Sequence, residues 1–205
     1  MPGTTFDVFV FDFDGTLVQS AAAKRKAFFE LFRPNHAPAV EAVLAADPDA
    51  SRFAVIPMIL AEIERRGLPV PDADAAGLIE AFARKADAAV AAAPEVPGAG
   101  ALLERLSGIG AVYVASMTPH EHLLAHLKQR TWARYITAAF GYPNRKVETV
   151  ASLLAAHGIA PERLLVVGDG PSDEEAAVRN GCCFHRINRM ADLLDVPTST
   201  QVVHV

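Results

Sequence analysis

Several features that would assign a protein to a particular class are missing from this sequence of 205 residues. The only two cysteines, Cys182 and Cys183, are adjacent. They therefore cannot join distant segments in an ordinary disulfide, and they lack the spaced pairs of a zinc site. No uninterrupted apolar run approaches the roughly 18 residues that span a bilayer. We therefore expect no membrane partner.

The charge balance and the first residues bear on nucleic-acid binding and on secretion. The chain has 19 basic and 24 acidic residues, a formal charge of -5, and no long basic tract, which disfavours nucleic acid as a partner. The opening residues MPGTT carry no basic region, and the apolar run behind them contains Asp7, Asp12 and Asp14. This pattern is untypical of a secretory signal, so we expect a cytoplasmic protein.

One stretch near the start brings acids to the end of an apolar segment. Residues 8–11, Val-Phe-Val-Phe, end abruptly in Asp12 and Asp14, and Gly15 follows. A run that is apolar on both side-chain phases suits a central parallel strand, and ligands gather at the carboxyl ends of such strands. Asp-Gly pairs also mark simple turns. Taken alone, this stretch is equally compatible with a turn and with a functional site.

The rest of the chain falls into two compositional parts. Residues 19–93 are alanine-rich, and their periodicity predicts helices over 21–32, 38–46, 51–66 and 72–92. Pro57 should kink the third of these or mark its true start. Two prolines and a glycine then punctuate residues 94–98 as a linker. We predict a helical domain over 19–93, inserted into a domain formed by 1–18 and 94–205.

Strands and helices alternate after the linker, which predicts a parallel sheet with crossover helices. The expected strands are 111–116, a weak one at 137–140, 163–169, 182–187 and an edge strand at 201–204. The expected helices are 99–107, 119–130, 147–157 and 172–180. The predicted fold class is therefore α/β: a Rossmann-like parallel sheet with helices on both faces, interrupted after its first strand by the helical insertion.

Polar residues follow each of these apolar runs, where a parallel sheet would bring them to one edge. They are Asp12, Asp14, Ser116, Lys146, Asp169 and Asp173. Any one of them could be accidental, but their joint occurrence in this order is far more specific than a lone motif. The sequence therefore favours a functional site over a simple turn.

These residues resemble the four motifs of the haloacid dehalogenase-like (HAD) superfamily of phosphotransfer enzymes. Residues 12–16 meet Asp-x-Asp-x-Thr, Ser116 closes an apolar strand as the second motif requires, and residues 168–173 meet Gly-Asp-x-x-x-Asp. Lys146 meets the third motif, with Arg145 as the alternative cation, because the Lys-Pro pair of many relatives is absent. The insertion is similar to the family's helical C1-type cap.

The resemblance implies an Mg²⁺-dependent phosphatase that hydrolyses a small phosphorylated metabolite. Phosphate monoesters hydrolyse very slowly without a catalyst, so a covalent intermediate that divides the barrier is favoured. Asp12 is the expected nucleophile, and Asp14 is the expected general acid and base. Mg²⁺ prefers oxygen ligands, and we expect Asp12, the backbone carbonyl of Asp14 and Asp169 to hold it, supported by Asp173.

The phosphoryl oxygens require fixed hydrogen-bond donors. We expect these from the Ser116 hydroxyl, from Lys146 and from backbone N–H groups near Met117, while Thr16 donates locally or supports the turn. Lys24 and Arg52 in the helical insertion are candidates for contacting a second anionic group on the substrate.

Other interpretations stay open. A phosphomutase of the same superfamily, similar to β-phosphoglucomutase, would use the same nucleophile and acid. A non-catalytic module that binds a phosphorylated ligand is a second alternative, although such a module would be expected to have lost a motif residue. His120, His122 and His126 lack the His-Glu-x-x-His order of a zinc site, so a helix face is favoured for them. Either a monomer or a homodimer fits the sequence.

Overall fold

The structure is a computed structural model that describes residues 4–47 and 50–200. The chain divides into two compact units, of which unit 1 comprises Met1–Gln19 and Pro94–Val205, and unit 2 comprises Ser20–Ala93. The predicted edge strand at 201–204 lies outside the described residues. Among the residues described, no helix has both the length and the apolar character needed to cross a membrane.

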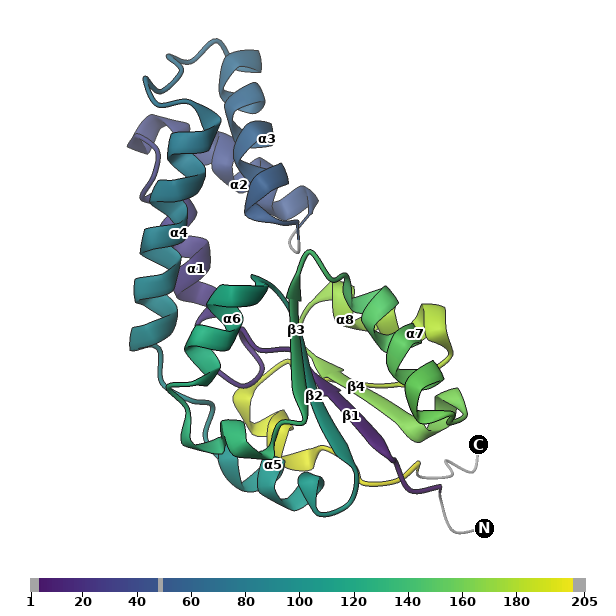
Figure 1. Cartoon of the computed structure of the whole chain (residues 1–205). Coiled ribbons are helices and arrows are strands. Elements are labelled where there is room, and N and C mark those ends of the chain that lie inside the picture. Colours follow the sequence, from purple (N-terminus) through teal and green to yellow (C-terminus); the bar gives the residue numbers. More distant parts are fainter. Residues whose placement is uncertain (1–3, 48–49, 201–205) are drawn as a thin grey trace. The chain divides into compact units, whose positions relative to one another are not determined.

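Unit 1 is built on a parallel sheet (Figure 1). Its five strands in the described part of the chain are β1 (Val8–Phe11), β2 (Ala111–Pro119), β3 (Ala138–Tyr142), β4 (Leu164–Gly168) and β5 (Cys183–Arg186). The order across the sheet is β3-β2-β1-β4-β5, and every neighbouring pair is parallel. The predicted Rossmann-like α/β fold class is confirmed, and β1 lies at the centre.

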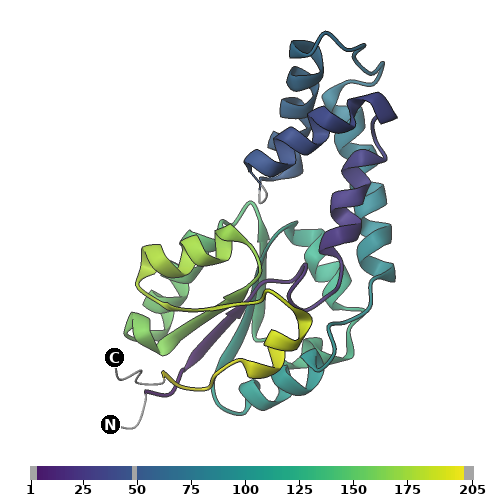
Figure 2. The same ribbon diagram turned by 180° about the vertical axis from the view of Figure 1, so that it is seen from behind.

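Helices cover both faces of this sheet (Figures 1 and 2). They are α5 (Ala99–Ser107), α6 (His120–Leu127), α7 (Lys146–His157) and α8 (Pro171–Asn180), joined by the short 3-10 helices η2 (Thr131–Tyr135), η3 (Pro161–Arg163) and η4 (Met190–Asp195). Successive strand residues point to opposite faces. Val8 and Val10 accordingly pack with Val150 of α7 and Ala176 of α8. Phe9 and Phe11, on the other phase, are also fully buried, so β1 is covered on both sides.

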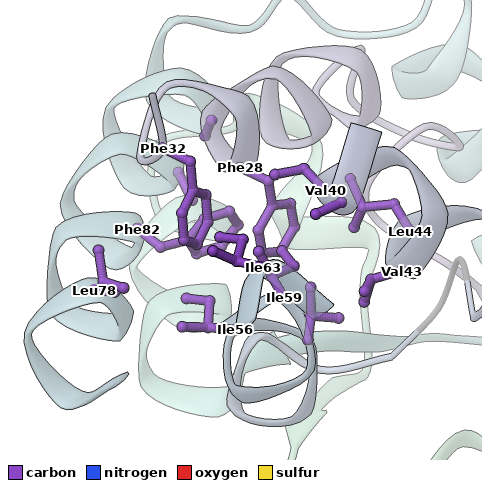
Figure 3. Packing of buried hydrophobic residues seen from close by; sticks show 14 residues of the cluster. Phe28, Phe32, Val40, Val43, Leu44, Ile56, Ile59, Ile63, Leu78 and Phe82 are labelled. Atoms are coloured by element: carbon purple, nitrogen blue, oxygen red, sulfur yellow. The ribbon is translucent and has the colours of Figure 1, made fainter. Parts of the chain in front are cut away.

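Unit 2 is helical and has its own apolar core (Figure 3). Its elements are α1 (Ala21–Phe29), η1 (Pro34–His36), α2 (Ala37–Ala46), α3 (Arg52–Arg65) and α4 (Ala75–Ala92). The rings of Phe28 and Phe82 stack with their centroids 4.0 Å apart, and Ile59 and Ile63 of α3 are fully buried in the same cluster. A residue pattern of period 3.6 buries one side of each helix in this core.

The ends of several elements differ from the predicted ones for local reasons. α1 ends at Phe29, before the predicted residue 32. α4 begins at Ala75 because the Asp74 side chain caps it, accepting a hydrogen bond from the Gly77 N–H at 2.8 Å. Pro57 lies inside α3, which begins at Arg52, so the proline does not mark the start of that helix.

The largest difference concerns the end of β2. This strand continues to Pro119, beyond the predicted end at residue 116, and α6 then ends at Leu127, before the predicted residue 130. The pairing of β2 with β3 shifts register between Ala115 and Pro119. Such bulges redirect side chains at the end of a strand.

Candidate active site

The end of β1 places Asp12 at the carboxyl edge of the sheet. The Asp12 N–H donates to the Val167 carbonyl of β4 at 2.9 Å, which fixes the backbone, and the residue is 8% exposed. Gly15 then adopts φ +85°, in the left-handed region that favours glycine, and a Cβ there would overlap the Asp169 carboxylate. A glycine at this position therefore lets the loop after β1 approach the end of β4.

The end of β4 supplies two further acids. Asp169 follows the strand and accepts a hydrogen bond from the Thr16 hydroxyl at 3.1 Å. Asp173, in the first turn of α8, accepts from the Gly170 N–H at 3.2 Å and is 1% exposed. A Cβ on Gly168 would overlap the Asp173 side chain. The ligand oxygens of Asp12, Asp169 and Asp173 all lie within 4.8 Å of one another, and we call these three residues the acid cluster.

Lys146 is the cation that reaches this cluster. It is the first residue of α7 and is 6% exposed, and its Nζ lies 3.1 Å from Asp12 Oδ1 and 2.8 Å from Asp173 Oδ1. The side chain of the alternative, Arg145, is 63% exposed and lies 3.6 Å from Glu148. The structure thus brings Lys146 to the acids and leaves Arg145 beside an exposed glutamate.

Burial dominates the electrostatics of these groups. Desolvation raises the pKa of Asp12 to about 7, a rise that Lys146 opposes and that Asp173 and Asp14 reinforce. Desolvation, with help from the charge of Asp12, raises the pKa of Asp169 to about 6. Burial likewise raises the pKa of Asp173. Burial lowers the pKa of Lys146, but the Asp12 and Asp173 carboxylates outweigh it, so that this pKa lies above its usual value.

The acid cluster has the donor set of a metal site. Three carboxylates stand against the single ammonium of Lys146, which contacts two of them. A hard divalent cation would supply the missing positive charge and would be held by oxygen ligands, which such cations prefer. Across residues 4–47 and 50–200, this is the only group of three or more acidic, histidine or cysteine side chains that could hold a metal. The chemistry of the residues therefore fits a metal ion.

The end of β2 contributes hydroxyl groups. Ser116 is 2% exposed, and its Oγ accepts a hydrogen bond from the Thr118 N–H at 3.1 Å, which leaves the hydroxyl hydrogen to be donated elsewhere. The Thr118 hydroxyl donates to Asp14 Oδ2 at 2.8 Å. Met117, between them, is half-buried. Sequence reasoning missed Thr118; the available signal was a second hydroxyl residue two positions after Ser116, on the same strand phase.

The remaining candidates are two cations of unit 2 and histidines of α6. Lys24 and Arg52 belong to unit 2, where Arg52 is 8% exposed and its guanidinium lies 5.3 Å from the centre of the Phe82 ring. In unit 1, His120 Nδ1 accepts from the Gly141 N–H at 3.3 Å, and the buried His126 ring stacks against Phe13. These two histidine contacts are those of a packed helix face.

The order of the sheet, the acids at its edge and the buried lysine agree with a comparison against known families. A family model described as haloacid dehalogenase-like hydrolase matches residues 6–181. This chain belongs to the haloacid dehalogenase-like hydrolases. The predicted superfamily is thus confirmed, and so is the prediction of a HAD-like enzyme. No curated protein matches the sequence.

Solved structures of HAD-like proteins share the fold at low sequence identity. A phosphoglycolate phosphatase candidate from Haemophilus somnus has a TM-score of 0.70 at 17% identity, covering 90% of this chain and 86% of that one. A HAD-hydrolase candidate from Bacillus subtilis, bound to magnesium, also has a TM-score of 0.70, at 16% identity and 90% coverage of both chains. A β-phosphoglucomutase candidate from Thermotoga maritima has a TM-score of 0.65 at 17% identity, covering 93% of this chain and 91% of that one.

The raised acid pKa values of this HAD-like hydrolase predict a pH-dependent stability without metal. A raised folded-state pKa means that the folded protein keeps a proton that the unfolded chain releases, so stability falls as pH rises through that interval. For Asp12 the interval runs from 3.8 to about 7, and for Asp169 from 3.8 to about 6. An asparagine side chain does not titrate, so Asp12→Asn should avoid this loss. Its stability relative to the unmodified protein should therefore increase as pH rises from about 4 to about 7 and stay constant above about pH 7.

The measurement is urea unfolding of the metal-free proteins at a series of pH values. Asp169→Asn serves as the matched variant, because its relative gain should level off about one pH unit earlier than that of Asp12→Asn. A stability difference between Asp12→Asn and the unmodified protein that stays constant from pH 4 to 8 would contradict the raised pKa of Asp12.

Proposed function

We propose that this HAD-like hydrolase is an Mg²⁺-dependent phosphatase that acts on a small phosphorylated metabolite through an aspartyl phosphate. The observation that carries the proposal is the position of Asp12: a buried carboxylate at the end of the central strand, 3.1 Å from the Lys146 ammonium and inside the acid cluster. Mg²⁺ held by Asp12 and Asp169, with the Asp14 carbonyl, would offset the charge repulsion between a carboxylate and a phosphoryl group.

In the first half-reaction, an Asp12 oxygen attacks phosphorus and the bond to the ester oxygen breaks. Asp14, two residues further along, gives its proton to the departing oxygen. Lys146 has three N–H donors, and Asp12 and Asp173 occupy two of them. The third, together with the Ser116 hydroxyl and the N–H groups near Met117, is available to a phosphoryl oxygen as charge develops.

In the second half-reaction, water attacks the phosphorus of the aspartyl phosphate, and Asp14 takes a proton from that water. The bond between Asp12 and phosphorus breaks, which restores the Asp12 carboxylate and releases inorganic phosphate. The same carboxyl group thus serves as the general acid in the first step and as the general base in the second. Thr16 supports the arrangement through its hydrogen bond to Asp169.

In this proposal residues 19–93 form a cap domain, and their side chains select the substrate. Lys24 and Arg52 remain its candidate contacts for a second anionic group on the substrate. Arg52 packs over the Phe82 ring and is buried within unit 2, whereas Lys24 is the more exposed of the two. The phosphomutase interpretation differs in the fate of the phosphoryl group, which would pass back to a substrate-derived hydroxyl instead of to water.

A screen of phosphorylated metabolites with Mg²⁺ tests the reaction class. We expect inorganic phosphate release from at least one sugar, nucleotide or organic-acid phosphate, and a loss on the order of 10³-fold or more in Asp12→Asn, because the nucleophile is gone. Asp72→Asn, the same substitution at an exposed position in unit 2, should retain full activity.

The outcomes of this screen separate the alternatives. Isomerised sugar phosphate without phosphate release would favour the mutase, and binding without any turnover would favour the non-catalytic module. Phosphate release by Asp12→Asn at the rate of the unmodified protein would show that Asp12 is not the nucleophile.

Mg²⁺ should stabilise the folded protein more at pH 8 than at pH 5. A ligand that binds the folded state raises the melting temperature, and at pH 5 the metal must displace protons from Asp12 and Asp169, whose pKa values are raised to about 7 and about 6. Thermal unfolding with and without Mg²⁺ measures this, and a chelator should reverse it.

Two variants sharpen the test by separating metal binding from proton transfer. Asp169→Asn should lose most of the Mg²⁺-dependent shift, whereas Asp14→Ala should keep it while losing turnover, because Asp14 contributes only its backbone carbonyl to the metal. Equal shifts at both pH values, or an intact shift in Asp169→Asn, would argue against a metal in the acid cluster.

A further inference from the structure

Thr118 lies at the end of β2 and contacts the residue assigned to proton transfer. It is 4% exposed, and its hydroxyl donates to Asp14 Oδ2 at 2.8 Å across 104 residues of sequence. The motif comparison does not require a hydroxyl at this position, since Ser116 alone fulfils the second motif. A buried hydroxyl that hydrogen-bonds a carboxylate contributes more than a neutral hydrogen bond does.

The backbone around Thr118 is built to hold it in place. The register shift between Ala115 and Pro119 turns this part of β2 out of regular pairing with β3. The Thr118 N–H is tied to Ser116 Oγ at 3.1 Å. On the neighbouring strand, a Cβ on Gly141 would overlap the Thr118 carbonyl and the His120 backbone, so the absence of a side chain lets β3 pack directly against this segment.

We propose that Thr118 is a positioning residue that holds the Asp14 carboxyl group in the orientation for proton transfer in both half-reactions. This inference rests on the proposed phosphatase function. The last torsion of an aspartate side chain is soft, and its two oxygens exchange places easily. A hydrogen bond from a fixed hydroxyl to Oδ2 restricts that rotation, and correct orientation of a reacting group lowers the barrier of the step it performs.

The leaving group of the substrate distinguishes this role from a structural one. An alkyl phosphate departs as a strongly basic alkoxide, which needs the proton from Asp14 as the phosphorus–oxygen bond breaks. p-Nitrophenyl phosphate departs as a weakly basic phenolate, which needs no proton. Misorientation of Asp14 should therefore slow the first step for the alkyl substrate alone, whereas a distorted site should slow it for both.

The experiment measures release of the alcohol or of p-nitrophenol in the first turnover by rapid mixing. The alkyl substrate is one identified by the metabolite screen. For Thr118→Val, which keeps the side-chain shape without the hydroxyl, we expect about a tenfold loss with the alkyl phosphate, the size of a charge-assisted hydrogen bond. With p-nitrophenyl phosphate we expect the first-turnover rate of the unmodified protein. The substrate concentration at half-maximal rate should not change for either.

The second half-reaction gives an independent readout. With the alkyl substrate Asp14 has given its proton to the leaving group, and with p-nitrophenyl phosphate it releases that proton to solvent before the second step. Because Asp14 must then take a proton from water in either case, phosphate release after the first turnover should be slower in Thr118→Val with both substrates. Thr118→Ser keeps the hydroxyl and should restore both steps. Thr149→Val removes another buried threonine hydroxyl, which is 6% exposed on α7, and should leave both steps unchanged.

The possible outcomes decide the proposal. The proposal is overturned if Thr118→Val has unaltered rates, or if it slows the first step equally for both substrates. It is also overturned if only the substrate concentration at half-maximal rate changes, or if Thr118→Ser fails to restore the rates. Should Thr118→Val not fold by circular dichroism, Thr118→Ala is measured instead and must show the same leaving-group selectivity. If the unmodified protein releases no phosphate, or Asp12→Asn is fully active, the phosphatase proposal itself fails, which is a different result.

Discussion

The contact of one buried ammonium with two buried carboxylates is the constraint on which the site depends. Lys146 Nζ lies 3.1 Å from Asp12 and 2.8 Å from Asp173, and all three side chains are nearly removed from solvent. A buried charge is costly unless it is paired, so each of these groups requires the others. One cation does not balance three acids, however, and this excess negative charge adds to the burial that raises the pKa values of Asp12 and Asp169. The same imbalance suits the site to a metal ion, which would in turn offset the repulsion between the acids and an anionic phosphoryl group.

The fold brings these groups together by crowding the ends of adjacent parallel strands. β1 lies between β2 and β4, so Asp14 meets the Thr118 hydroxyl of β2, and Asp12 meets the two acids that follow β4. Close approach requires glycine at two points: a side chain on Gly15 would overlap Asp169, and one on Gly168 would overlap Asp173. The glycines that flank the motif acids therefore serve packing as much as backbone freedom.

The sequence was sufficient to predict the strands whose residues are apolar on both phases, such as β1 and β4, and the acids that follow them. It also indicated Lys146, because a lysine at the start of a helix after a strand lies at the same edge of the sheet. It did not predict the extension of β2 to Pro119, since a bulge depends on pairing with β3. The contact of Thr118 with Asp14 was equally hidden, because it joins residues 104 positions apart. The sequence could not rank Lys24 and Arg52 of unit 2, because the direction of a side chain on a helix is not specified by helical periodicity alone.

The most direct test of the central claim is to trap the covalent intermediate. The HAD-like hydrolase is mixed with its substrate and Mg²⁺, quenched, and treated with borohydride, which reduces an acyl phosphate of aspartate to homoserine. Peptide mass spectrometry should then find homoserine at position 12 and at no other aspartate, and none in Asp12→Asn. A protein that turns over substrate yet yields no modified residue, or yields one at a different aspartate, would contradict the account of Asp12 as the nucleophile.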